Sequence, residues 1–236
     1  MLACFGFFEY KTKMLPQPIE NLAEKFRKFP GIGFRSSQKL ALDILQTYQE
    51  DYQELLIALD FMRKNVDFCQ NCGFFSQGKI CDICSNKNRT DLQICLVEKP
   101  TDIITLERSE SFRGKYHVLQ NLISPLENIF PENTTLSDLF DHRIPQALNS
   151  TEFLHQNQKD TLNQTPNPIQ LELILFFKAG FSAEATTAYL RETVAQKGWQ
   201  SKIKITRLAQ GLPLYYNPDT LDQATMIRAL EDRREV

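Results

Sequence analysis

The chain has 236 residues, of which 42% are hydrophobic and 24% are charged, and its formal net charge is −2 at pH 7. This is an ordinary globular composition, sufficient for one large domain or two smaller ones. The near-neutral balance excludes a global nucleic-acid signature, so any DNA contact must come from a local basic patch. No apolar run approaches the ~20 residues of a membrane span. The apolar start lacks a basic segment before it and is a poor signal peptide, so we expect a cytoplasmic protein.

Residues 14–66 are predicted to form helices, because their apolar side chains recur at helical spacing. The three stripes are Ile19, Leu22, Phe26 and Phe29, then Leu40, Ile44 and Leu45, then Leu55, Leu56, Leu59 and Met62. Pro30-Gly31-Ile32-Gly33 interrupts the pattern between the first two stripes. We therefore expect a helix-hairpin-helix whose second helix begins near Ser36.

The hairpin turn is a candidate phosphate site. Gly31 and Gly33 permit positive φ and a close approach of the backbone to a ligand. The first N–H groups of the following helix suit a phosphate oxygen. The surrounding cations are Lys25, Arg27, Lys28, Arg35 and Lys39, with no acidic residue from 25 to 42. This pattern favours sequence-independent contact with a nucleic-acid backbone. A capped turn with merely solvated lysines stays open as an alternative.

Two cysteine pairs, Cys69-x-x-Cys72 and Cys81-x-x-Cys84, lie eight residues apart. Four thiolates in two such pairs are typical of a structural, tetrahedral Zn²⁺ site, which we predict with one ion per chain. A pair of disulfides, a redox pair and an iron–sulfur cluster are the alternatives. Cys95 lies in an apolar run and is predicted to be a small core residue.

From residue 92 the pattern changes to alternating strands and helices, which predicts an open, mostly parallel α/β sheet. Strands are expected at Leu92–Glu98, Tyr116–Leu119, Ile169–Phe177 and Lys202–Leu208, and helices at Asp102–Ser109, Ala183–Lys197 and Ala224–Arg233. His117 lies in an apolar strand and is predicted to be a core residue. Residues 150–168 are polar and are expected to be a surface loop or insertion.

Together these features resemble the RecR family of bacterial recombination-repair proteins. The motifs that carry the resemblance are Pro30–Gly33, Ser37–Leu40, the four cysteines, Tyr116–Leu119, Ile123–Leu126, Glu184–Thr186, Gly211–Pro213, Thr225 and Arg228–Glu231. The resemblance implies an α+β multidomain fold. Its expected parts are a helix-hairpin-helix at 14–66, a four-cysteine zinc finger at 67–90, a Toprim-like α/β domain with a mostly parallel sheet at 91–213 and a C-terminal helical element at 214–236. Residues 1–13 are expected to be an extension.

The resemblance also implies a function in DNA repair. It implies homo-oligomers, either dimers or ring-shaped tetramers, that clamp DNA with little sequence preference and act with RecO and RecF to load recombinase at gaps. Cys69, Cys72, Cys81 and Cys84 match the family's zinc ligands, and Arg35 and Lys39 match its DNA-contacting positions. Glu98 and Glu184 match the Toprim acids and are expected to contact a basic partner. Association with the bacterial nucleoid follows from the same resemblance.

We expect no enzymatic activity. A working Toprim site holds Mg²⁺ with a glutamate and an Asp-x-Asp pair after a later strand. Here Lys178-Ala179-Gly180 follows the strand, and a lysine opposes metal binding there. Two alternatives stay open: an Mg²⁺-dependent nuclease or primase-like enzyme, and a scaffold that binds only proteins.

Overall fold

The computed structural model describes residues 15–149 and 170–208. The chain divides into two compact units between Asn65 and Val66, and each unit is described by itself. The expected extension at 1–13, the polar segment at 150–168 and the closing helix at 224–233 within the element at 214–236 lie outside the described residues. Within the described ranges, no helix is long and apolar enough to cross a membrane.

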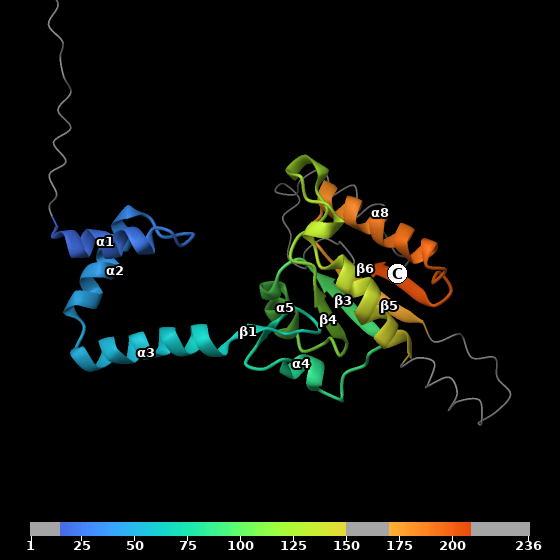
Figure 1. Cartoon of the computed structure of the whole chain (residues 1–236), viewed down its shortest axis with the longest axis horizontal. Helices are drawn as coiled ribbons and strands as arrows, with labels where there is room; N and C mark the ends of the chain where they lie inside the picture. Colours follow the sequence, from blue (N-terminus) through green and yellow to red (C-terminus); the bar gives the residue numbers. More distant parts are fainter. Residues whose placement is uncertain (1–14, 150–169, 209–236) are drawn as a thin grey trace, which may run out of the picture. The chain divides into compact units, whose positions relative to one another are not determined.

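The first unit consists of three helices, α1 (Gln17–Phe26), α2 (Phe34–Gln46) and α3 (Gln49–Asn65) (Figure 1). The buried residues of α1 and α2 are small, namely Ala23, Ser37 and Ala41, which lets the two helices approach closely. The predicted helix-hairpin-helix is confirmed. However, α2 begins at Phe34 and not near Ser36, because Gly33 has extended backbone and already serves as the N-cap.

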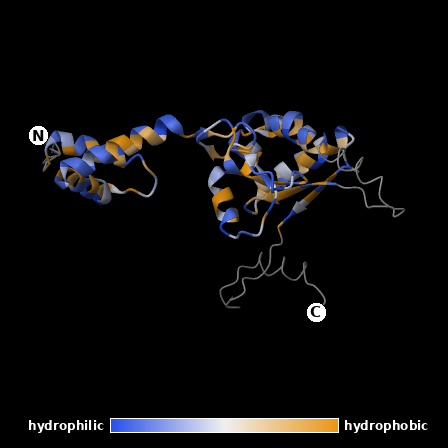
Figure 2. Cartoon of the chain, turned by 90° about the horizontal axis from the view of Figure 1, so that it is seen from below, coloured by the Kyte–Doolittle hydropathy of each residue, from blue (hydrophilic) through white to orange (hydrophobic). Residues whose placement is uncertain are grey.

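No residue of the described α3 is buried. Its large apolar side chains, including Leu56, Ile57 and Phe61, are exposed. Figure 2 shows hydrophobic residues along this helix as well as on the strands of the second unit. The helix predicted from the third apolar stripe is confirmed, but within the described unit that stripe does not form a core.

The second unit contains a four-stranded parallel sheet in the order β4-β3-β5-β6. The strands are β3 (Gln93–Val97), β4 (Lys115–Val118), β5 (Leu171–Phe176) and β6 (Ile203–Arg207). Each lies within two residues of the predicted strand, and the predicted parallel α/β architecture is confirmed. In the register, Cys95 is paired with Tyr116 on one side and with Ile174 on the other.

Both faces of the sheet are covered, as parallel sheets require. Ile94 and Leu96 point to a large core shared with α8 (Phe181–Gln196) and with the helical residues 136–149. Cys95 and Val97 point to the opposite face, where α5 (Pro100–Glu107) contributes Ile103. Figure 1 shows α8 and α5 on different sides of the strands. The burial of Ile94–Val97 in β3 follows from this sandwich.

The remaining elements are short. They are β1 (Asp67–Phe68), β2 (Phe75–Ser76), α4 (Asp82–Ser85), η1 (Pro125–Glu127), η2 (Pro131–Asn133), α6 (Leu136–Asp138) and the π-helix η3 (Leu139–Arg143). Helices α5 and α8 each begin two residues before their predicted start. For α5 the reason is local: Pro100 occupies the first turn, and the Asp102 carboxylate accepts a hydrogen bond from the Lys99 amide at 2.9 Å.

Candidate metal centre and nucleic-acid interface

The turn between α1 and α2 depends on a glycine. Gly31 has φ +82°, in the left-handed region that side chains with a Cβ rarely adopt. Gly33 then caps α2 without any side-chain hydrogen bond to the helix, and the first turn contains no acidic residue. The first N–H groups of α2 therefore have no side-chain acceptor from the cap, and the positive end of the helix dipole is not neutralised locally.

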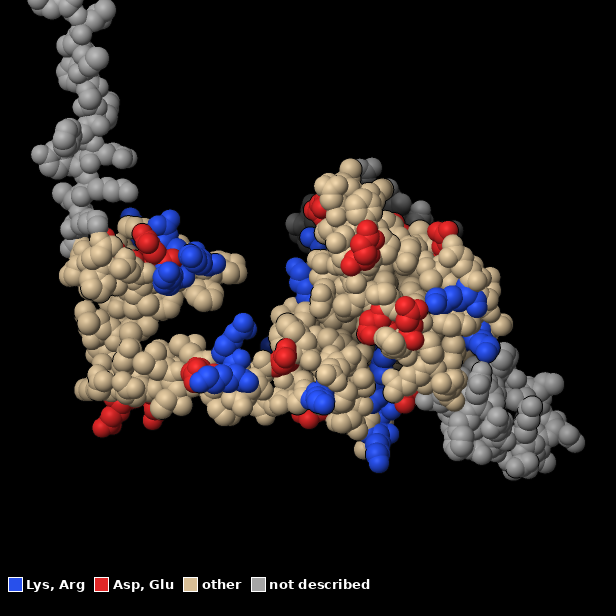
Figure 3. Space-filling model, in the orientation of Figure 1, with Lys and Arg blue, Asp and Glu red and all other residues tan. Residues whose placement is uncertain are grey.

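Five cations surround this turn, and all are exposed. Lys25, Arg27 and Lys28 come from the end of α1 and just after it, and Arg35 and Lys39 come from α2. Arg27 also lies over the ring of Phe34, 5.7 Å from its centroid, which joins the two ends of the turn. Figure 3 shows Lys and Arg side chains gathered over this hairpin. Exposed guanidinium and ammonium groups beside free helix N–H groups suit phosphate oxygens.

The four cysteines of the second unit converge. Cys69 and Cys72 flank a tight turn in which the Gly73 amide donates to the Cys69 carbonyl at 2.9 Å, and Gly73 adopts φ +74°. Cys81 lies just before the single turn of α4, and Cys84 lies in that turn. Cys69, Cys72 and Cys81 are buried and Cys84 is partly buried. The predicted convergence of the two pairs is confirmed.

This cluster can hold a metal ion. The four Sγ atoms all lie within 4.8 Å of one another, and sulfurs at about 2.3 Å from one tetrahedral ion are about 3.8 Å apart. None of the four is in a disulfide, so the disulfide alternative is wrong. Hydrogen bonds from the thiols of Cys72 and Cys84 hold the pKa of Cys81 well below its usual range, and the Cys81 amide donates to the Cys69 Sγ at 3.3 Å. These contacts stabilise a thiolate at Cys81, the form that binds metal, while the hydrogen bonds to Cys81 and Cys84 raise the pKa of Cys72.

The cysteine module packs directly on the sheet. Phe74 and Ile83 contact both the cysteine cluster and the core around Val97 and Tyr116. The Cys72 carbonyl accepts a hydrogen bond from the Val118 amide of β4 at 2.9 Å. Since β4 is an edge strand of the described sheet, this hydrogen bond satisfies a backbone group that would otherwise be open to pairing with another chain.

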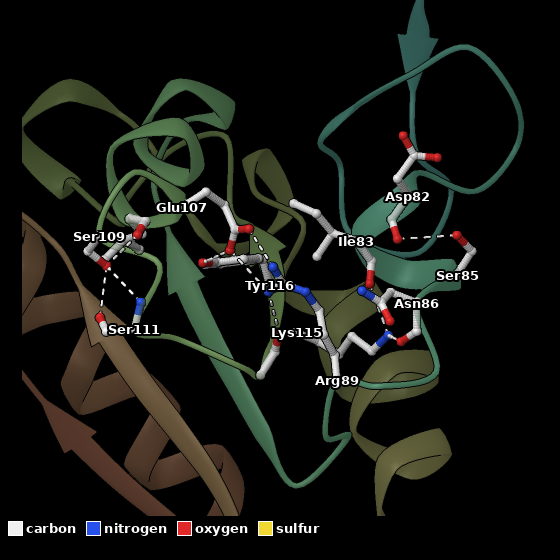
Figure 4. A network of polar contacts seen from close by, with 12 residues as sticks. Asp82, Ile83, Ser85, Asn86, Arg89, Glu107, Ser109, Ser111, Lys115 and Tyr116 are labelled. Atoms are coloured by element: carbon white, nitrogen blue, oxygen red, sulfur yellow. Dashed lines mark hydrogen bonds and ion pairs between the residues drawn. The ribbon is translucent and has the colours of Figure 1, made fainter.

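Sequence reasoning did not identify a polar network at the other end of β4. Lys115, buried in this strand, donates to backbone carbonyls of the cysteine module. Nearby, Arg89 forms an ion pair with Glu107, whose carboxylate also accepts the Tyr116 hydroxyl at 2.5 Å (Figure 4). Burial and the Glu107 hydrogen bond raise the pKa of Tyr116. The sequence carries no clear signal for this network, because Lys115 precedes the predicted strand and its acceptors are backbone carbonyls.

The predicted core residues behave as expected. Cys95 is buried, and burial raises the pKa of its thiol to about 12. His117 is also buried, with Nε2 at 3.0 Å from the Thr135 hydroxyl. Both side chains contribute to packing around β3 and β4.

A cavity of about 450 Å³ lies at the carboxyl ends of the strands. Its lining includes Glu98 after β3, Asn121 and Glu127 from the segment after β4, and Lys178 after β5. Strand order reverses around β3, and such crossover points are where open α/β sheets bind ligands. Lys178 lies in the same cavity as Glu98. It follows the strand after which a working Toprim site would have its Asp-x-Asp pair, as the sequence indicated.

The two predicted Toprim acids have different surroundings. Glu98 is 3.9 Å from the ammonium of its neighbour Lys99. Glu184, in the first turn of α8, accepts a hydrogen bond from Arg207 of β6 at 2.7 Å. Among the described residues, the only group of three or more Cys, His, Asp or Glu close enough to share an ion is the cysteine cluster. The described residues thus bring no carboxylate triad together at this edge of the sheet.

The comparisons with known proteins agree with this architecture. The family model for the RecR helix-hairpin-helix matches residues 19–62, and the Toprim domain model matches residues 93–209. Recombination protein RecR of Herpetosiphon aurantiacus is 34% identical over 229 residues, which cover 97% of this chain and 99% of that protein. The RecR proteins of Synechocystis sp. and Bdellovibrio bacteriovorus are each 35% identical, over 93% and 92% of this chain and 83% and 97% of their own lengths. The chain therefore belongs to the RecR family of recombination proteins.

Proposed function

We propose that this chain is a DNA-binding factor of recombinational repair that holds the sugar-phosphate backbone without reading base sequence. The observation that carries the proposal is the glycine-capped start of α2 beside five exposed cations. Backbone N–H groups and Arg35 and Lys39 supply phosphate contacts, which dominate non-specific affinity. Lys25, Arg27 and Lys28 extend the same surface, and Gly31 and Gly33 leave it open to close approach.

We also propose that the chain acts as a homo-oligomer that clamps DNA, with RecO and RecF as partners in loading recombinase at gaps. Membership of the RecR family supports this assignment. A chain with net charge −2 has little overall attraction for DNA, so several hairpins in one assembly would supply the missing affinity by valency.

The metal we assign to the cysteine cluster is zinc, in a structural role. An all-thiolate, largely buried set of four ligands leaves no open position for substrate. When bound, the ion supplies cross-links between the two cysteine turns. Cys69, Cys72, Cys81 and Cys84 would hold it, and the surrounding core would keep water away.

The proposed function is non-catalytic. Lys178 lies in the cavity with Glu98, and Arg207 binds Glu184, so the described carboxylates offer poor support for a shared Mg²⁺ ion. The discriminating assay incubates the protein with labelled single- and double-stranded DNA in Mg²⁺ or Mn²⁺. Cleavage or synthesis that disappears in Glu98→Gln would replace this proposal with the enzymatic alternative.

The test of DNA binding is the double substitution of Arg35 and Lys39 by alanine. The slope of log affinity against log salt concentration is expected to flatten by about one unit for each phosphate that the variant no longer binds, with no change in base preference. The matched control replaces Arg191 and Lys204, an exposed pair with the same charges on the second unit. An unchanged salt slope in the hairpin variant, or an equal decrease in the control, would contradict the proposal.

A further inference from the structure

Lys115 is a buried lysine whose three donors are matched by three backbone carbonyls. This residue is the first of the edge strand β4, and it is only 4% exposed. Its Nζ donates to the carbonyls of Ile83, Cys84 and Asn86 at 3.0, 2.9 and 2.8 Å (Figure 4). An ammonium has three donors, so this arrangement satisfies each of them without a carboxylate. A buried charge is tolerated only when it is matched in this way.

The three acceptors belong to the second cysteine turn. Cys84 is itself one of the four sulfur ligands, and the other two residues flank it at α4. Carbonyls at the end of a helical turn lack partners within the helix and carry partial negative charge. They converge on one point only while this turn keeps its shape. The environment of Lys115 therefore depends on the segment that carries Cys81 and Cys84.

The first cysteine turn is attached to the same strand at its other end. The Val118 amide donates to the Cys72 carbonyl at 2.9 Å. A Cβ at Gly73 would lie 3.1 Å from the Val118 Cβ, so the turn packs closely against the strand. Each cysteine pair is thus tied to one end of β4, through Lys115 and through Val118.

We propose that Lys115 is a positioning residue of the metal centre, and that it couples metal occupancy to the order of the edge strand. Loss of the ion would release the second turn and leave the buried ammonium without its acceptors. By linkage, loss of the ammonium would weaken the metal site to the same extent. This inference rests on the part of the proposed function that gives the cluster a metal, and is independent of DNA binding.

The first experiment measures zinc affinity of the full chain by competition with a chelator. Lys115→Met keeps a similar length and removes the charge, and Lys87→Met is the control, since Lys87 is an exposed lysine of the same module. Substitution of groups that orient ligands typically costs about 10–100-fold in metal affinity, which is the decrease expected for Lys115→Met. Lys87→Met is expected to stay within about twofold. Equal affinities of the two variants would overturn the inference.

The second measurement uses the unaltered chain, in case Lys115→Met does not fold. Hydrogen exchange is compared before and after zinc is removed with a chelator. Exchange in β4 (Lys115–Val118) is expected to accelerate at least about tenfold more than in β5 (Leu171–Phe176). The reason is that β4 loses its contacts with the cysteine module, whereas β5 has strands on both sides. No change in β4, or the same change in both strands, would overturn the coupling. A chain that binds no zinc at all would remove the metal assignment and this inference together.

Discussion

Arg207 of β6 donates through Nη1 to the Glu184 Oε1 at 2.7 Å, and so joins the sheet to the first turn of α8. Arg207 also reaches the Thr187 hydroxyl one helical turn later, at 3.3 Å. The hydrogen bond with Glu184 raises the pKa of Arg207. The carboxylate that the sequence marked as a contact for a basic partner already has a cation beside it, and any partner must compete with that cation.

This competition predicts opposite effects for two substitutions. Glu184→Gln should weaken binding to RecO, because it removes the proposed acidic contact. Arg207→Gln should strengthen it, because it removes one cation that competes for the carboxylate. The pair is surface-exposed, at 58% for the Glu184 side chain and 34% for that of Arg207, so the free energy of unfolding should change by less than about 1 kcal/mol in either variant. Calorimetric titration with RecO measures both effects.

Glu192→Gln is the matched control for this prediction, since Glu192 is an exposed acid of the same helix that contacts Gln196. It should leave RecO binding unchanged. Weaker binding in both the Glu184 and the Arg207 variants would indicate a structural role for the ion pair and would contradict a competition between partner and arginine.

The cysteine cluster makes a second prediction. Protein purified without chelator should contain about one zinc per chain, and Cys72→Ser should lose most of it and unfold at a lower temperature, because a closed zinc site contributes folding energy. Elemental analysis and thermal unfolding measure the two effects. Cys95→Ser is the control: its thiol is buried outside the cluster, so metal content should stay at about one per chain. A metal-free wild-type chain would refute the site.

The architecture was predictable wherever one residue pattern determines one structure. The apolar character of Ile94–Val97 and Leu171–Phe176 identified two central strands, and the spacing of four cysteines identified a converging cluster. Pro30–Gly33 identified the hairpin because few residues other than glycine adopt the φ of Gly31. In each case the signal is local in the sequence.

Contacts between distant segments were not predictable. Lys115 binds carbonyls about thirty residues earlier, and no pattern in the sequence indicates where a backbone carbonyl will point. Arg207 and Glu184 are 23 residues apart and meet only because β6 lies beside β5. The predicted start of α2 is two residues too late, because the extended Gly33 already caps the helix. The contacts of Lys115 and Arg207 depend on tertiary packing.

His117 predicts a pH dependence of stability. Burial lowers its pKa below the ordinary value near 6.5. The folded chain therefore keeps the ring neutral, while the unfolded chain binds a proton as the pH falls below about 6.5. The contribution to stability is fully present above that value and is lost as the pH falls toward the folded pKa, by at most about 1.4 kcal/mol per pH unit.

His117→Gln is the variant that tests this contribution. It should be less stable at pH 7.5, because the Thr135 contact of a 2% exposed side chain is changed. The difference in unfolding free energy between wild type and variant should nevertheless shrink from pH 7 to pH 5.5. Denaturant unfolding at several pH values measures this difference. The contribution of the cysteine cluster to the unfolding free energy is the same in both proteins and cancels. A constant difference would show that His117 does not titrate on unfolding.

Gly31 provides the last prediction, on the hairpin. With φ +82°, an alanine at this position must adopt a left-handed backbone, which costs about 1–2 kcal/mol, although its Cβ would meet nothing within 4 Å. Gly33→Ala is the matched control. Its φ of −82° is open to any residue, so only the weaker capping ability of alanine matters, which costs less than about 1 kcal/mol.

The measurement is hydrogen exchange at two amides that close the hairpin, those of Ile32 and Ser37, which donate to Phe29 and Gly33. Gly31→Ala should accelerate the exchange of these two amides by about 5–30-fold, the factor that corresponds to 1–2 kcal/mol. The DNA affinity of the variant should also fall, because the proposed phosphate-binding start of α2 is then populated less often. If Gly33→Ala accelerates exchange as much as Gly31→Ala does, then the left-handed residue is not what holds the hairpin in shape.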